Sequence, residues 1–200
     1  MTTIVLVSKD TDGLSINNFK TVDDRRISQL NFENVGINAD QIVATGDEAE
    51  QLIKDAINYG TLCVSAEAVG CMESCYLKTV EYTKSREQFG QPISNFQVLQ
   101  HKMVDMFIEA ELCKSLLYKS MIDMHENNDS KYRSVSALKS QVGLSGKKVG
   151  EDAVQLHGGM GVSEEMSIGH YLKKFIVIDS QFGNSKYHLT QFKNIDERSK

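Results

Sequence analysis

The chain has 200 residues, of which 40% are hydrophobic and 24% charged; this is the ordinary balance of a globular protein and excludes disordered and collagen-like chains. Acidic residues outnumber basic ones by 27 to 22, giving a formal net charge of −5 at pH 7, which disfavours nucleic-acid binding. No run approaches the roughly 18 consecutive apolar residues of a membrane span, and the first residues do not resemble a secretory signal. We therefore expect a cytoplasmic protein without a membrane span.

Residues 1–45 carry short apolar runs separated by turn residues, which is the pattern of strands. The runs lie at 4–7, 16–19 and 26–32, and in the last of them Ser28, Leu30 and Phe32 share one face at period two. Three strands alone make a poor domain because their edges and one face lack partners. We interpret residues 1–45 as a partial β-domain, the end of a larger sheet.

From residue 46 onward the apolar residues recur with a helical period. The pattern predicts long helices at 47–82, 95–125 and 132–157, and shorter ones at 164–178 and 184–192. The predicted fold class is mainly α: an antiparallel four-helix-type bundle over residues 46–200, preceded by the partial sheet. In the first helix, the expected core stripe consists of Leu52, Ala56, Cys63, Ala66 and Gly70.

The second and third expected helices carry apolar seams with alternating steps of four and three, which is typical of antiparallel bundle packing. The seam of the second helix comprises Leu99, Met103, Met106, Ala110, Cys113 and Leu117. The seam of the third comprises Val135, Leu138, Val142, Ser145, Val149, Ala153 and Leu156, and Gly143, Gly146 and Gly150 would let a neighbouring helix approach closely. The four cysteines lie in helical segments without further metal ligands nearby, so we expect free thiols and no metal site.

Two segments of the chain carry more polar residues than the packing of a helical bundle requires. The first, Arg86 to Ile93, joins two long helices and places a guanidinium and two carboxamides around a glycine and a proline; this guanidinium is suited to a phosphate, or is simply solvated. The second, Gln155 to Gly161, ends a helix in three glycines, which either bring backbone N–H groups close to an anion or merely terminate the helix. Each segment by itself leaves both interpretations open.

The order and spacing of these segments carry more information than either alone. Four blocks follow one another along the chain: Tyr82-x3-Arg86-x-Gln-Phe-Gly-x-Pro-Ile, Phe96-Gln97-x2-Gln100, Asp105-Met106 and Gln155-x-His-Gly-Gly-x-Gly. Together they resemble the carboxy-terminal half of the acyl-CoA dehydrogenases, over nearly the whole chain. Phe182-Gly-Asn with His188 is further similar to the branch that contains the small subunit of pimeloyl-CoA dehydrogenase.

The resemblance implies an oxidoreductase of fatty acid metabolism that passes electrons from the α,β carbons of an acyl-CoA to FAD. Members of the family hold the FAD of a neighbouring subunit with the turn and the glycine-rich loop, so homo-oligomers or hetero-oligomers with a related subunit are expected, and an electron-transfer flavoprotein is the implied acceptor. Carried over residue by residue, the expected cofactor-binding residues are Arg86, Gln88, Phe89, Gln97, Gln155, Gly159 and Asn184.

The general base is where this sequence departs from the family. The family places a glutamate either at the position matching Phe182 or at the position matching Gly60, and neither residue accepts a proton. Asp179 is the nearest carboxylate in sequence to Phe182 and a weak candidate for the base; a capping aspartate is the simpler interpretation. Glu67 is a similar candidate, two helical turns from Gly60.

Three hypotheses therefore remain. The first is a FAD-associated acyl-CoA dehydrogenase homologue, present as a fragment or as a chain that works only with partners, because the segments that hold the flavin ring and most of the acyl-CoA in the family have no match here. The second is a non-catalytic assembly subunit that lends half of a flavin site to a catalytic partner. The third is a helical module without a cofactor.

Overall fold

The computed structural model describes the backbone of residues 1–197 and the side chains of residues 1–194. The chain forms two compact units, one of residues 1–59 and one that starts at Gly60. The long helix α1, Gly46–Ser85, contributes residues to both. The two units are described separately here.

The first unit contains two small antiparallel sheets. Strand β1, Thr3–Val5, pairs with β4, Ile42–Thr45, and β2, Leu14–Lys20, pairs with β3, Arg26–Phe32. In the second sheet Leu30 faces Ile16 and Phe32 faces Leu14, as the period-two pattern requires. The three predicted strands are therefore present. The pattern missed β4, because its four residues and the short 3-10 turn before it run directly into α1.

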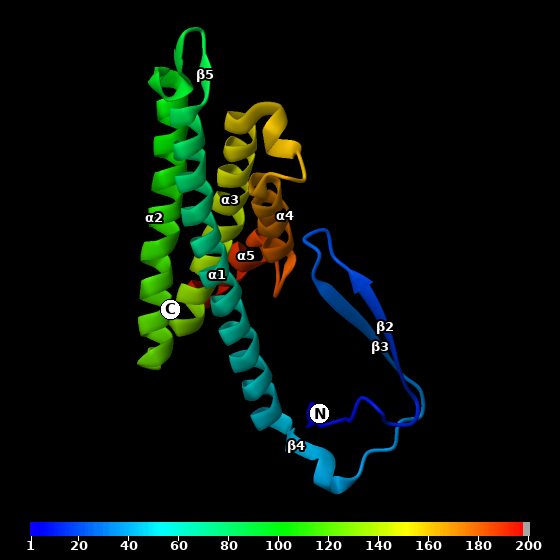
Figure 1. Ribbon diagram of the computed structural model, residues 1–200. Helices are drawn as coiled ribbons and strands as arrows, with labels where there is room; N and C mark the ends of the chain where they lie inside the picture. Colours follow the sequence, from blue (N-terminus) through cyan, green and yellow to red (C-terminus); the bar gives the residue numbers. More distant parts are fainter. Residues whose placement is uncertain (198–200) are drawn as a thin grey trace. The chain divides into compact units, whose positions relative to one another are not determined.

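The second unit is a helical bundle (Figure 1). After α1 come a tight hairpin of β5, Glu87–Gln88, and β6, Gln91–Pro92, and then a 3-10 turn, η2, Ile93–Asn95. The remaining elements are α2, Gln97–His125; α3, Lys131–His157; η3, Gly158–Val162; α4, Ser167–Ser180; and α5, Ser185–Glu197. Helix α3 packs against α2 and also against α4 and α5. The predicted mainly helical fold is confirmed.

The core of this unit follows the predicted seams of α2 and α3. All seven predicted α3 residues are buried, as are the last four residues of the α2 seam, while Leu99 and Met103 are partly buried against the same core. The α3 glycines allow the expected close approach: a Cβ on Gly150 would lie 2.9 Å from Leu172 Cδ1, and one on Gly146 would lie 3.1 Å from Phe175 Cδ1. Helix α4 therefore packs directly on the backbone of α3.

The predicted core stripe of α1 is wrong, because all five of its residues, Leu52, Ala56, Cys63, Ala66 and Gly70, are exposed. The residues of α1 that face the core include Thr61, Ser65, Ala68, Val69, Met72, Cys75 and Thr79. Three of these carry hydroxyl groups, which a search for apolar periodicity does not count. The hydroxyl of Ser65 donates to the Thr61 carbonyl at 2.7 Å and that of Thr79 to the Cys75 carbonyl at 2.8 Å, so both are satisfied within the helix.

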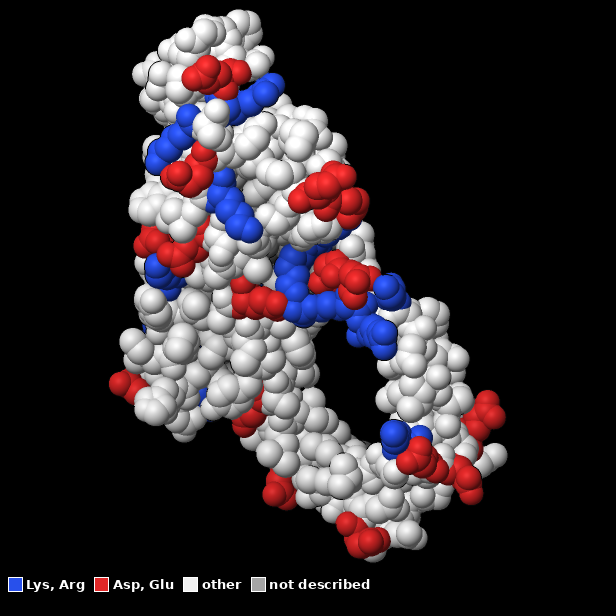
Figure 2. Space-filling view, in the orientation of Figure 1, with Lys and Arg blue, Asp and Glu red and all other residues white. Residues whose placement is uncertain are grey.

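All four cysteines are free thiols, as expected. Burial raises the pKa of the Cys75 thiol to about 12 and that of Cys113 to about 11, so these two stay protonated and unreactive at neutral pH. Within residues 1–197 no helix is long and apolar enough to cross a membrane. On the face of the bundle in Figure 2, basic and acidic side chains are interspersed and form no broad basic area.

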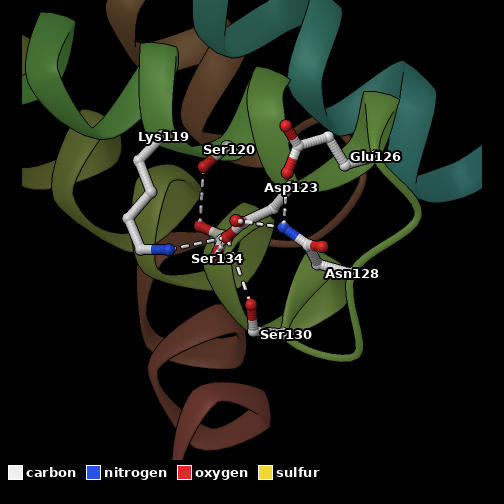
Figure 3. Close-up of polar contacts among 7 residues, drawn as sticks. All are labelled: Lys119, Ser120, Asp123, Glu126, Asn128, Ser130 and Ser134. Carbon is white, nitrogen blue, oxygen red and sulfur yellow. Dashed lines mark hydrogen bonds and ion pairs between the residues drawn. The ribbon is translucent and has the colours of Figure 1, made fainter.

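A buried polar cluster closes the turn between α2 and α3 (Figure 3). The Asp123 carboxylate, with a side chain 8% exposed, accepts hydrogen bonds from the Ser134 hydroxyl and from Lys119 Nζ at 2.7 Å. It also accepts bonds from Asn128 Nδ2 at 3.1 Å and from the Ser130 hydroxyl at 3.3 Å. The carboxylate thus ties the end of one long helix to the start of the next.

Candidate functional site

The two polar segments of the sequence meet at one hollow of about 520 Å³ in the bundle. Arg86 and Gln88 line it from the segment after α1, Gln155 lines it from the end of α3, and Gly159 lines it from η3, which follows α3 directly. The other lining residues are Tyr82, Ile93, Leu156, His157, Gly158 and Met160. The fold therefore gathers four of the seven expected cofactor-binding residues around a single space.

Backbone hydrogen bonds fix the turn that carries Arg86. Its N–H donates to the Tyr82 carbonyl at 2.9 Å, and its carbonyl accepts from Ile93 N–H at 2.8 Å, which closes the hairpin. Phe89 and Gly90 at the tip have φ of 57° and 80°, and this left-handed conformation is rare for a phenylalanine. The Phe89 side chain is 92% exposed, meets Phe96 edge-on at the tip, and is not among the residues that line the hollow.

His157 and Tyr82 form one wall of the hollow, and neither was among the expected site residues. Their rings stack with centroids 4.1 Å apart, and His157 Nδ1 lies 2.8 Å from the Ala153 carbonyl, where it donates. Burial lowers the pKa of His157, so the ring is neutral at pH 7. Both residues stand in the motif blocks of the sequence, but nothing in the sequence indicates that they stack.

The electrostatics of the hollow suit an anion. Within the described part of the chain no carboxylate pairs with the Arg86 guanidinium, which leaves its N–H groups available for a bidentate contact. The carboxamide of Gln155 adds a neutral donor. Gly158 has a φ of 59°, and a Cβ on Gly158 or Gly159 would meet no atom within 4 Å, so the backbone there is open to a ligand.

The two positions implied for a base lie next to each other, where the loop between α4 and α5 meets α1. A Cβ on Gly60 would lie only 2.6 Å from Cζ of Phe182, so the phenyl ring packs directly on the glycine. The loop holds Phe182 at φ 55° and Gly183 at φ 97°. A hydrocarbon contact thus occupies the place where the resemblance implies a carboxylate.

The remaining expected residues lie away from the hollow. Asp179 Oδ1 accepts the Ser185 N–H at 2.9 Å and Asn184 Oδ1 accepts the Tyr187 N–H at 2.9 Å, so both side chains cap α5. This geometry agrees with the interpretation of Asp179 as a capping residue. Glu67 pairs with Lys174 at 2.8 Å, and Gln97 is an exposed residue at the start of α2.

Comparison with known proteins gives consistent matches. A family profile described as "Acyl-CoA dehydrogenase, C-terminal domain" matches residues 51–194. The chain is 26% identical over 183 residues to the short-chain specific acyl-CoA dehydrogenase of Megasphaera elsdenii, covering 90% of this chain and 45% of that protein. It is 25% identical over 172 residues to the mitochondrial isobutyryl-CoA dehydrogenase of Dictyostelium discoideum, covering 84% of this chain and 41% of that protein.

Solved structures show the same fold. Butyryl-CoA dehydrogenase from Megasphaera elsdenii matches with a TM-score of 0.89 at 23% identity, over 96% of this chain and 51% of that one. PigA, solved with FAD and proline, matches with a TM-score of 0.90 at 23% identity and with the same coverage. The chain spans about half the length of the relatives it matches.

Proposed function

Because the chain belongs to the acyl-CoA dehydrogenase family and contains its carboxy-terminal domain, we propose that it is a FAD-associated acyl-CoA dehydrogenase homologue that works in an assembly with other chains. Its part is to hold the diphosphate portion of FAD in the hollow between Arg86 and Gly159. The observation that supports this proposal is the meeting of an unpaired guanidinium, carboxamides and open glycine backbone in one space. When bound, FAD would supply the acceptor for the electrons removed from an acyl-CoA.

In this proposal each residue of the hollow has a distinct role. The Arg86 guanidinium binds phosphate oxygens through charge-assisted hydrogen bonds, and Gln155 and Gln88 add neutral ones. The stacked rings of Tyr82 and His157 keep one wall of the hollow fixed, since the Tyr82 hydroxyl also donates to the His157 carbonyl at 3.4 Å. The neutral state of His157 leaves Arg86 as the positive charge of the hollow.

A partner chain is part of the proposal because the side of α2 opposite the core seam carries a row of exposed apolar residues. Val104, Ile108 and Leu112 follow one another at steps of four on the side opposite the core seam, and they are 53%, 45% and 52% exposed. We propose that this face packs against a second copy or a related subunit, and that an electron-transfer flavoprotein receives the electrons from the assembly. Rows of exposed apolar side chains of this kind mark association surfaces.

Sedimentation of the assembly isolated through a tagged copy of this chain, recorded at 280 nm for protein and 450 nm for flavin, tests both parts of the proposal. We expect a species larger than a monomer that carries the flavin absorbance, and no flavin in any monomer boundary after addition of FAD. A clean monomer at micromolar concentration would contradict the assembly. A large species that excludes added FAD would contradict the flavin site.

A second function, a non-catalytic subunit that lends its hollow to the flavin of a catalytic partner, is favoured by the contact between Phe182 and Gly60. That contact leaves no proton acceptor at either implied base position. One measurement distinguishes the two functions. If acyl-CoA esters bleach the flavin in an assembly of this chain alone, the result supports the acyl-CoA dehydrogenase function. Bleaching only when a related, base-containing subunit is present supports the lending subunit.

A further inference from the structure

Two buried side chains form hydrogen bonds to the backbone of the loop between α4 and α5. Neither of them belongs to the proposed flavin site. Lys139, on α3, is fully buried, and its Nζ donates to the carbonyl of Asp179 at 2.9 Å and to that of Gly183 at 2.8 Å. His188, on α5, is 4% exposed, and its Nε2 lies 2.9 Å from the Phe182 carbonyl. Three carbonyls within five residues of chain are therefore bonded to buried side chains.

This arrangement is costly for a merely structural loop. A buried ammonium group loses its hydration, and burial lowers the pKa of Lys139 to about 8 although the neighbouring Asp179 opposes the shift. Phe182 is also held in a left-handed backbone conformation, which is unfavourable for a non-glycine residue and persists only where the surroundings enforce it. The two buried donors bond the carbonyl of Phe182 and the carbonyls of residues on either side of it.

We propose that Lys139 and His188 are positioning residues, which together fix the loop so that the Phe182 ring stays on Gly60. Removal of His188 frees the carbonyl of Phe182, and removal of Lys139 frees those of Asp179 and Gly183; in either case the strained residue then relaxes and its ring leaves α1. Lys139 and His188 thereby keep the phenyl ring of Phe182 at the position where the resemblance implies a general base. The proposal concerns the chain without cofactor and stands independently of flavin binding.

The chain contains no tryptophan, so Phe182→Trp introduces a single indole as a reporter of this contact. Phe182 is 45% exposed, which leaves room for the larger ring on the outer side. In that background we expect Lys139→Met to shift the emission to longer wavelength and to raise the acrylamide quenching constant about twofold. The matched control is Lys147→Met, also on α3 with a side chain 64% exposed, which should leave both quantities unchanged.

His188 gives a second, milder pair of variants. His188→Leu removes the donor to the Phe182 carbonyl and should raise the quenching as Lys139→Met does, whereas His188→Gln keeps an amide donor and should restore the reference value. If Lys139→Met does not fold, the quenching constants of His188→Leu and His188→Gln test the proposal. Unchanged quenching in folded Lys139→Met or His188→Leu, or an equal rise in Lys147→Met, would overturn the proposal.

Discussion

Replacing Asp123 by alanine is expected to lower the free energy of unfolding by about 3 kcal/mol. Hydrogen bonds to a buried charged group contribute more than bonds between neutral groups, and loss of the carboxylate leaves its donors without an acceptor. The carboxylate has four side-chain donors, from Lys119, Asn128, Ser130 and Ser134, and the Ser134 side chain is itself buried. Urea denaturation followed by circular dichroism measures the change. Lys119→Ala is the control, since Lys119 is 59% exposed and an exposed partner contributes about 1 kcal/mol or less.

The same cluster predicts the pH dependence of stability. The hydrogen bond from Lys119, with that from Ser134, holds the pKa of Asp123 well below its ordinary value. A depressed carboxylate pKa stabilises the folded state above the unfolded-state pKa of about 3.9, and this stabilisation is lost as the pH falls through the folded-state pKa. The stability difference between wild type and Asp123→Asn should therefore be full at pH 7 and shrink below about pH 4. A difference that stays constant from pH 7 to pH 3 would show that the carboxylate charge does not contribute.

Gly150→Val is expected to destabilise the bundle by about 3 kcal/mol or to prevent folding, because overpacking a close helix contact forces backbone shifts. A Cβ at Gly150 would lie 2.9 Å from Leu172 Cδ1 and 3.2 Å from Leu172 Cα, and the backbone atom cannot rotate away. Gly70→Ala is the matched control, since a Cβ there meets nothing within 4 Å and alanine should stabilise the helix by up to about 1 kcal/mol. Thermal unfolding of the two variants should shift in opposite directions. A Gly150→Val protein as stable as wild type would show that α3 and α4 do not pack this closely.

The sequence predicted those parts of the fold that depend on apolar periodicity. The apolar seams of α2 and α3 face the core, and the glycines of α3 lie at a close helix contact, as the pattern predicted. This follows because aliphatic side chains on one face of a helix are buried together against the core. The core face of α1 was missed because it contains Thr61, Ser65 and Thr79, whose burial has no apolar signature. The hydroxyls of Ser65 and Thr79 donate to carbonyls of the same helix, which makes their burial possible.

The candidate site was predictable only through spacing shared with a family. Arg86 and Gln155 are far apart in sequence, and no local rule brings the end of α1 beside the end of α3. Nor does any local rule place Phe182 on Gly60, although the resemblance had marked both as base positions. The stack of Tyr82 on His157 and the buried donors Lys139 and His188 arise from tertiary packing, which the amino-acid sequence alone does not reveal.

The central claim, that the hollow holds the diphosphate of FAD, is tested most directly by the affinity of the deflavinated assembly for FAD in variants of the hollow. Arg86→Ala should weaken FAD binding by about tenfold or more, since a charge-assisted bond is worth about 1.5–3 kcal/mol, and Gln155→Ala should weaken it less, since a neutral bond is worth about 0.5–1.5 kcal/mol. Lys147→Ala removes the same charge from an exposed part of α3 and should leave the affinity at the wild-type value. An Arg86→Ala assembly that binds FAD as tightly as wild type, or a Lys147→Ala assembly that loses as much affinity, would contradict the account.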